Sequence, residues 1–242
     1  MQAWFEDLKA TFVLNFVQAN RWKYLVDGLG MTLAITLLAG VIGVIIGVII
    51  AMIRSTYDKT AANSRQTFGR KVFGFADWFC RVYLTVLRGT PVLIQLMIIY
   101  YVIFAASDNG MLVAALAFGL NSGAYVAEIV RGGIMSIDNG QFEAGRSLGF
   151  NYLQTMRFII IPQTVKNVLP SLANELIALL KETSVAGYVA VVDLTKGGDI
   201  IRSRTYSAFM PLIGVALIYL AMVMFFTKLV SILERRLRNS DH

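Results

Sequence analysis

The chain has 242 residues, of which 57% are hydrophobic and only 15% are charged, and its mean hydropathy is +0.64. A soluble domain of this length carries roughly 25% charged residues, because its whole surface must be wetted. The composition therefore excludes an ordinary soluble domain and indicates an integral membrane protein. The net charge of +7 is better explained by lysines and arginines on the cytoplasmic side of a membrane than by nucleic-acid binding.

Residue types that carry out catalysis or bind metals are scarce. Cys80 is the single cysteine and His242 the single histidine, so the sequence has no disulfide, no CxxC motif and no Cys/His cluster. No glycine is followed by lysine, so the phosphate-binding pattern GxxxxGK[ST] is missing. We expect a protein that is not an enzyme, has no catalytic or metal site, and relies on a partner chain for any ATP hydrolysis.

Residues 1–27 are rich in aromatic side chains but also carry acidic and basic ones. They lack the basic start and apolar run of a cleavable signal peptide. We expect an amphipathic segment on the membrane surface.

Apolar stretches separated by polar ones predict an all-α protein with five transmembrane helices. The expected spans are about 28–53, 78–106, 111–130, 165–192 and 207–233. Pro91 is expected to kink the second span, and a tight turn is expected at Ser107–Gly110. The remaining stretches are expected to be polar connections at 54–77 and 193–206, a cytoplasmic loop at 131–163, and a short tail at 238–242.

The distribution of basic residues predicts the orientation of these spans. The connection after span one, the loop after span three and the C-terminus share one side, and with their flanks they hold 15 of the 22 lysines and arginines. The opposite side holds six, and Lys181 lies within span four. The positive-inside rule therefore places the C-terminus in the cytoplasm and the N-terminus outside.

The cytoplasmic loop contains a motif of defined spacing, Glu143–Pro162, which reads EAGRSLGFNYLQTMRFIIIP. Small residues followed by a glycine allow a short helix and turn to press closely into a groove on another protein. Glu143 and Arg146 would supply polar contacts at the rim. Four residues of the same stretch would supply apolar contact: Leu148, Phe150, Leu153 and Phe158. The residue pattern therefore favours a docking helix over an ordinary surface loop.

This loop resembles the EAA loop of ABC importer permeases. Glu143 and Ala144 match, and Gly149, Ile159 and Pro162 fall at the required spacing. Two positions depart from the pattern: Gly145 replaces its second alanine, and Ile161 replaces its leucine. Three further stretches and the closing helix resemble the polar-amino-acid branch of that family: Arg88–Leu96, Ala124–Ser136 and Asn174–Ser184. The resemblance covers about residues 24–237.

The resemblance implies the fold of a type I (MetI-like) permease in the bacterial cytoplasmic membrane, and ATP-driven import of a polar amino acid by alternating access. It also implies a second permease subunit, cytoplasmic ATP-binding subunits that hold ATP and Mg, and an extracytoplasmic substrate-binding protein. The ATPase-coupling residues would be Glu143, Ala144, Gly145, Arg146, Gly149 and Pro162. The alternative is a self-contained secondary transporter or channel, a class that often carries internal repeats and no docking loop.

Span four is the most polar of the five, because it contains Glu175, Lys181 and Glu182. At about 3 kcal/mol for each charge near the bilayer centre, three charges facing lipid would cost roughly 9 kcal/mol. A polar stripe facing a water-filled path, or a structural ion pair within the bundle, would remove most of that cost, and both interpretations stay open. The candidate path or gate residues are Glu175, Lys181, Glu182, Thr183, Ser184, Arg88 and Glu128.

Several of these residues have a second interpretation. Glu128 lies within one helical turn of Arg131, which favours a local ion pair.

The two acidic residues of span four favour a cationic amino acid as the substrate, although Lys181 weakens this argument. Gly43 and Gly47 form a GxxxG pair, for which close packing within the chain is favoured over dimerisation. The sequence leaves open whether the second permease subunit is identical or related.

Overall fold

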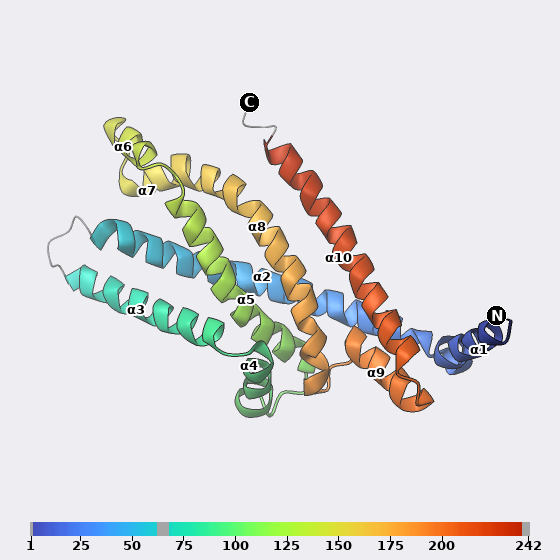
Figure 1. Cartoon of the computed structure of the whole chain (residues 1–242). Coiled ribbons are helices and arrows are strands. Elements are labelled where there is room, and N and C mark those ends of the chain that lie inside the picture. Colours follow the sequence, from blue (N-terminus) through green and yellow to red (C-terminus); the bar gives the residue numbers. More distant parts are fainter. Residues whose placement is uncertain (1, 62–67, 239–242) are drawn as a thin grey trace. The chain divides into compact units, whose positions relative to one another are not determined.

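The computed structural model describes residues 2–61 and 68–238, and all regular elements in those ranges are helices (Figure 1). The α-helices are α1 Gln2–Phe12, α2 Trp22–Ala61, α3 Phe68–Gly89, α4 Val92–Ile98, α5 Gly110–Met135, α6 Asn139–Ser147, α7 Tyr152–Thr155, α8 Ile161–Glu182, α9 Leu194–Thr205 and α10 Phe209–Arg238. Short π-helical or 3₁₀ segments connect several of them: η1 Val13–Val17, η2 Gln18–Asn20, η3 Ile99–Ile103, η4 Met156–Ile160 and η5 Thr183–Val189. Of the tail expected at 238–242, Arg238 ends α10 and residues 239–242 lie outside the described part of the chain.

Three of the described helices, α2, α5 and α10, are long and apolar enough to cross a membrane. The pair α3 and α4 makes a fourth candidate if the two helices are counted as one bent span. The helix α8 is not among the candidates, because its central turns carry polar and charged side chains. The all-helical membrane fold is confirmed, while five spans and their orientation stay predictions.

Two expected boundaries are wrong. The stretch 54–77 was expected to be a polar connection, but α2 continues to Ala61 and α3 already begins at Phe68, with residues 62–67 outside the described part of the chain. Charged residues can extend a helix when they lie on one face, and α3 is strongly amphipathic. The second expected span is divided in two rather than kinked, because Pro91 offers no N–H and disfavours helical backbone at Thr90.

The stretch 193–206 was expected to be a polar loop but forms the helix α9. Asp193 caps it by accepting hydrogen bonds from the backbone N–H groups of Thr195 (3.3 Å) and Lys196 (2.9 Å). The Asp193 side chain is fully buried, and this burial raises the pKa of its carboxyl group against the opposing effect of these hydrogen bonds. Gly197 lies so close to the backbone of α2 that an added Cβ would be 2.3 Å from the Tyr24 carbonyl oxygen. Tertiary packing therefore stabilises a helix whose two glycines make it a weak helix former.

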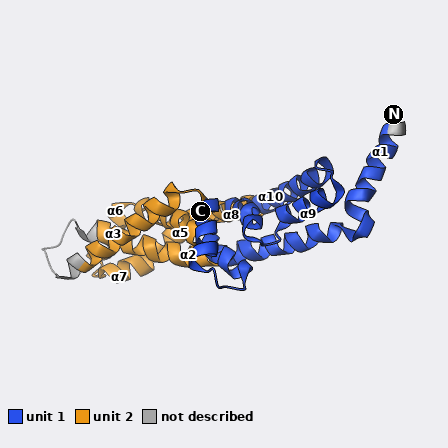
Figure 2. Ribbon diagram, turned by 90° about the horizontal axis from the view of Figure 1, so that it is seen from below, with its two compact units in different colours: residues 1–39, 92–118, 177–228 blue, residues 40–91, 119–176, 229–242 orange. Residues whose placement is uncertain are grey.

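The chain divides into two compact units, which Figure 2 distinguishes by colour. Unit 1 contains residues 1–39, 92–118 and 177–228, and unit 2 contains residues 40–91, 119–176 and 229–242. In unit 1, the hydrophobic core joins Leu25 of α2, Leu194 and Ile201 of α9, and Val215 of α10.

The N-terminal segment contributes to unit 1. Trp4 of α1 is exposed, as expected of a surface segment. Asn15 is fully buried, however, and its carbonyl oxygen accepts a hydrogen bond of 2.8 Å from the Thr205 hydroxyl group. Its amide donates to the Ser207 hydroxyl group at 3.3 Å. Part of the segment is therefore packed against the junction of α9 and α10.

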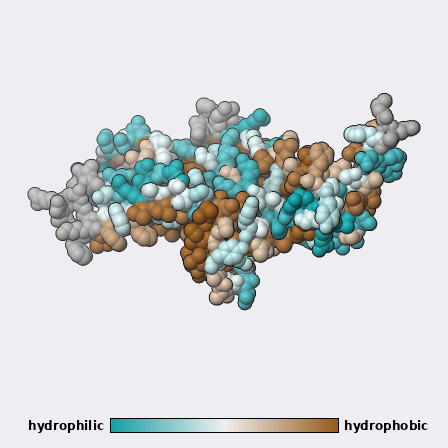
Figure 3. Space-filling view, turned by 60° about the horizontal axis from the view of Figure 1, so that its bottom comes forward, coloured by the Kyte–Doolittle hydropathy of each residue, from teal (hydrophilic) through white to brown (hydrophobic). Residues whose placement is uncertain are grey.

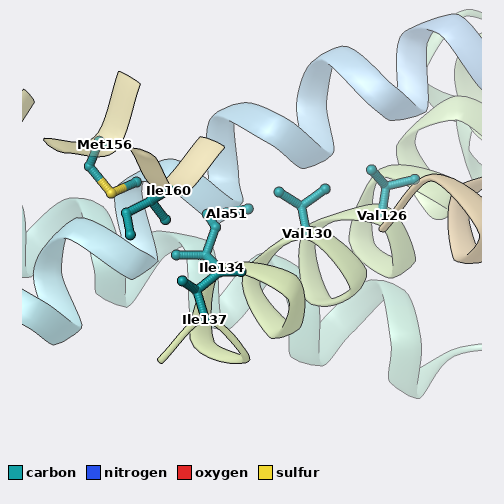
Figure 4. Close-up of a cluster of buried hydrophobic side chains, with 7 residues drawn as sticks. All are labelled: Ala51, Val126, Val130, Ile134, Ile137, Met156 and Ile160. Carbon is teal, nitrogen blue, oxygen red and sulfur yellow. The ribbon is translucent and has the colours of Figure 1, made fainter. Parts of the chain in front are cut away.

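Unit 2 is built on a close contact of α2 with α5. A Cβ atom added at Gly43 would lie 3.1 Å from the Ser122 side chain, and one added at Gly47 would lie 2.5 Å from Cγ1 of Val126. The expected GxxxG pair therefore packs within the chain, which is the interpretation that the sequence favoured. Beside this contact, Ala51 of α2, three α5 residues and Ile137, which follows α5, form an apolar cluster with Met156 and Ile160 of η4 (Figure 4).

Large apolar side chains remain exposed on several helices, above all on α2, α3 and α10. Figure 3 shows such apolar areas beside hydrophilic ones on one face of the molecule. Exposed apolar area of this extent is unusual for a soluble monomer and is expected where lipid or another membrane subunit covers the surface.

The glycines of α2 provide a test of this packing. We expect Gly47→Ala to lower the free energy of unfolding by about 1–3 kcal/mol, because the methyl group overlaps Val126. Gly30→Ala is the matched control, since a Cβ there has no atom within 4 Å and alanine favours the helix by about 0.5–1 kcal/mol. Unfolding in detergent measures both variants, and equal stabilities would contradict the packing of α2 on α5.

Candidate functional site

The segment between α5 and α8, here called the coupling segment, comprises residues 139–160. Its first helix, α6, begins at Asp138, whose side chain accepts a 2.6 Å hydrogen bond from the Gly140 N–H. The helix ends in a Schellman motif: Phe150 N–H donates to the Gly145 carbonyl (3.1 Å) and Gly149 N–H donates to the Arg146 carbonyl (2.9 Å). Gly149 has φ +83°, a left-handed conformation in which a side chain is strained. The glycine of the motif is therefore required by the turn itself.

The second half of the coupling segment returns the chain to the bundle. Asn151 and Gln154 form a capping box that starts α7. The helix continues through η4 into α8, which begins at Ile161. Pro162 is the second residue of α8 and directly follows the π-helical turn η4 and Ile161. Span four was expected to begin only at 165.

Gly145 stands where the EAA pattern has its second alanine, and the space around it explains why a glycine fits there. The residue is buried where α6 packs against α7 and η4. A Cβ atom there would lie 2.7 Å from Cγ2 of Thr155 and 3.0 Å from Cδ1 of Ile159. In this chain the side chains of Thr155 and Ile159 occupy the space that an alanine methyl group would need. Glycine at position 145 therefore fits beside the bulky side chains of Thr155 and Ile159, where alanine would not.

The coupling segment has one buried and one exposed apolar face. Met156 and Ile160 are buried against α2 and α5 (Figure 4). Leu148, Leu153 and Phe158 point away from the chain and are 73%, 75% and 60% exposed. Glu143, Ala144, Arg146 and Pro162 are also exposed. An exposed apolar surface with a polar rim, on a segment fixed to the bundle, has the composition of a protein-binding surface.

The expected path residues of span four are distributed over both units. Glu175 lies in unit 2, where the Ser122 hydroxyl group of α5 donates a 2.9 Å hydrogen bond to its carboxylate. Lys181, Glu182, Thr183 and Ser184 lie in unit 1. Lys181 is exposed and Glu182 is half-buried, whereas Thr183 is buried and its hydroxyl group donates to the Leu180 carbonyl at 2.8 Å. Lys181 and Glu182 therefore remain the more accessible polar groups at this end of α8.

The two other path candidates lie in unit 2 and have local partners. The Arg88 guanidinium group lies over the Tyr125 ring, 5.5 Å from its centre. Glu128 forms the expected pair with Arg131 (3.4 Å), but its shorter contact is with Arg54 of α2 (2.6 Å). The sequence interpretation missed Arg54 and its second partner, Asp77 of α3. The pairs Arg54/Asp58 and Asp77/Arg81, each spaced i,i+4 beside an apolar run, are the signal that could have found them.

No group of three or more His, Cys, Asp and Glu side chains in the described ranges could hold a metal ion. The chemistry that these residues support is recognition and conformational change, on an all-helical membrane fold that carries an exposed apolar segment between α5 and α8.

Comparison with known proteins identifies the family. The sequence profile of the family described as "Binding-protein-dependent transport system inner membrane component" matches residues 65–239. The putative glutamine transport system permease protein GlnP of Rickettsia bellii is 40% identical over 166 residues, which cover 67% of this chain and 74% of that protein.

Solved structures agree in fold. A crystal structure of an amino acid ABC transporter with histidines superposes with a TM-score of 0.78 at 39% identity and covers 91% of this chain and 97% of that one. An inward-facing MetNI methionine ABC transporter superposes with a TM-score of 0.74 at 20% identity, with coverage of 91% and 98%. The second likeness shows the fold alone, and it confirms the expected MetI-like architecture.

The chain belongs to the family of inner membrane components of binding-protein-dependent transport systems. It is a multi-pass permease subunit and not itself an ATPase, as the sequence predicted. Systems of this class combine such a subunit with a binding protein and an ATPase. Membership in the family sets aside the alternative of a self-contained secondary transporter or channel.

The packing of Gly145 generates a double-mutant prediction. We expect Gly145→Ala to destabilise the protein by about 1–3 kcal/mol, because the methyl group overlaps Thr155. In the Gly145→Ala background, Thr155→Ala should recover part of this loss by removing the two Thr155 atoms that lie within 3 Å of the new methyl group. Unfolding of the two single variants and the double variant in detergent measures the coupling. If the double variant loses as much free energy of unfolding as the two single variants together, Thr155 does not prevent an alanine at position 145.

Proposed function

We propose that this chain is the membrane-spanning half of an ATP-driven importer that carries a polar amino acid into the cell. The observation that carries the proposal is the coupling segment, which is anchored to α2 and α5 by its buried face and presents Leu148, Leu153 and Phe158 on its exposed face. The amino-acid class rests on relatives named for glutamine and for amino acids.

The coupling segment receives the movement of the ATPase. In this proposal the cytoplasmic ATP-binding subunits hold ATP and Mg and receive the exposed apolar side chains in a groove, with Glu143 and Arg146 at its rim. ATP binding brings the ATPase subunits together, and the segment follows as a rigid body. Because the Schellman turn and the capping box leave it few alternative conformations, a push on its exposed face moves the helices that it packs against.

The transport path requires groups that can replace part of the hydration of a polar solute. Glu175, Lys181 and Glu182 of α8 are the proposed wall of that path, with Thr183, Ser184, Arg88 and Glu128 as gate or support. Two carboxylates favour a cationic amino acid, and Lys181 opposes it. We therefore propose the class of polar amino acids, with cationic ones tested first. A second permease subunit, identical or related, completes the path, and an extracytoplasmic binding protein delivers the substrate.

Reconstitution tests this function. The chain is assembled into liposomes with its ATPase and binding protein, and uptake of labelled arginine, histidine, glutamine, glutamate and leucine is measured with and without ATP. We expect ATP-dependent uptake of one or more polar amino acids. Uptake that persists without ATP, or uptake of leucine alone, would contradict the proposal.

The docking surface has its own test. Leu153→Glu places a charge on the exposed apolar face, and we expect it to reduce co-purification of the ATPase by about tenfold or more, the effect of about 1.4 kcal/mol at an interface. Tyr206→Glu is the control, because Tyr206 is also a large exposed side chain (97%, against 75% for Leu153) but lies after α9 in unit 1. Equal retention of the ATPase by both variants would show that the coupling segment is not the docking surface.

A further inference from the structure

Six charged side chains connect α2, α3 and α5 within unit 2. Each helix contributes one basic and one acidic residue, so the group has no net charge. We call the six residues the charge network: Arg54 and Asp58 on α2, Asp77 and Arg81 on α3, and Glu128 and Arg131 on α5.

The network is a continuous series of alternating charges. Arg81 contacts Asp77 (2.7 Å), and Asp77 contacts Arg54 (3.7 Å). The series continues from Arg54 to Glu128 (2.6 Å), then to Arg131 (3.4 Å), and ends at Asp58 (3.4 Å), back on α2. Arg54 is its centre, because it is the residue that contacts carboxylates on both other helices.

The middle of the network is shielded from solvent. The side chains of Asp77 and Arg54 are 4% and 13% exposed. An ion pair at this depth adds little net stability compared with apolar residues of the same size, although removing one partner alone leaves a buried charge. An apolar core already joins α2, α3 and α5. The buried ion pairs between the same helices therefore indicate a role other than net stabilisation.

The coupling segment packs beside the network. The Tyr152 hydroxyl group donates a 3.5 Å hydrogen bond to the hydroxyl group of Thr56, which lies on α2 between Arg54 and Asp58. Met156 and Ile160 pack on Ala51 of α2 and on α5 (Figure 4). The coupling segment therefore contacts α2 and α5 directly, while the network extends from these two helices to α3.

Apolar contacts alone define the relative position of membrane helices poorly, because lipid tails are as apolar as the side chains they replace. A charged hydrogen bond such as that from Arg54 to Glu128 (2.6 Å) is directional and short-ranged, so it fixes one register of α2 against α5. The Arg54–Asp77 contact of 3.7 Å adds an ion pair, without a hydrogen bond, between α2 and α3. A rigid-body movement needs such fixed registers, since helices that slide past one another absorb the displacement.

We propose that the charge network is a register lock, which makes α2, α3 and α5 move as one body when the coupling segment is displaced. Arg54 is the positioning residue, and it acts through Glu128 and Asp77. This inference rests on the proposed ATP-driven function. Its consequence is specific: loss of the lock separates ATP hydrolysis from transport.

The key variant is Arg54→Met with Asp77→Met, since neither residue is assigned to the transport path. It replaces the buried pair by apolar side chains, and the four remaining charges still sum to zero, so a merely structural pair would be replaced without functional loss. Stability by unfolding in detergent, ATP hydrolysis and substrate uptake are measured on the complete transporter in liposomes. We expect stability and ATP hydrolysis close to those of the wild type, with amino acid transported per ATP reduced about fivefold or more.

Two further variants keep the test decisive. Asp77→Asn retains the side-chain volume and is expected to lower transport per ATP in the same direction, so it serves if the double variant does not fold. Asp199→Met with Arg202→Met is the matched control, because it removes an ion pair of α9 in unit 1 and should leave transport per ATP unchanged.

The lock is overturned if the network variants fold and retain the wild-type transport per ATP, or if the ratio falls only in proportion to lost stability. A wild-type transporter without ATP-dependent uptake would instead overturn the proposed function. The two failures are therefore distinguishable in one set of measurements.

Discussion

The close contact of α2 with α5 sets the geometry on which unit 2 depends. Gly43 and Gly47 remove the side chains that would separate the two helices, and Ser122 and Val126 occupy the space that this leaves. At this short distance, Arg54, seven residues after Gly47, comes within hydrogen-bonding range of Glu128, two residues after Val126. The same contact places Ala51 beside apolar α5 residues, and Met156 and Ile160 of the coupling segment pack against them. A larger residue at position 47 would therefore disturb both the charge network and the coupling segment.

The coupling segment shows how backbone requirements and packing select the residues of a recognition motif. Gly149 is required by a left-handed turn, whereas Gly145 is required by the bulk of Thr155 and Ile159. The two glycines look equivalent in sequence, yet their physical reasons differ. A glycine at a positive φ angle is needed whatever surrounds it, while one beside a bulky neighbour can change together with that neighbour.

Polar groups in unit 1 position elements that are too short or too polar to be stable alone. The buried Asn15 connects the N-terminal segment to Thr205 and Ser207, and the buried Asp193 caps α9. In a bundle whose outer surface is apolar, such hydrogen bonds supply the directionality that apolar contact lacks. They explain why residues 193–206 form a helix although their composition is that of a loop.

The sequence by itself determined the membrane class, the helical fold and the spaced motif Glu143–Pro162, because these depend on composition, on the length of apolar runs and on local spacing. The pair of Glu128 with Arg131 was also predictable, since residues three apart on a helix are neighbours. Only the tertiary structure decided that Arg54 is the closer partner of Glu128, that Asp77 joins from α3, and that α9 is a helix. These features depend on which side chains distant parts of the chain bring together, and periodicity within one helix carries no information about its neighbours.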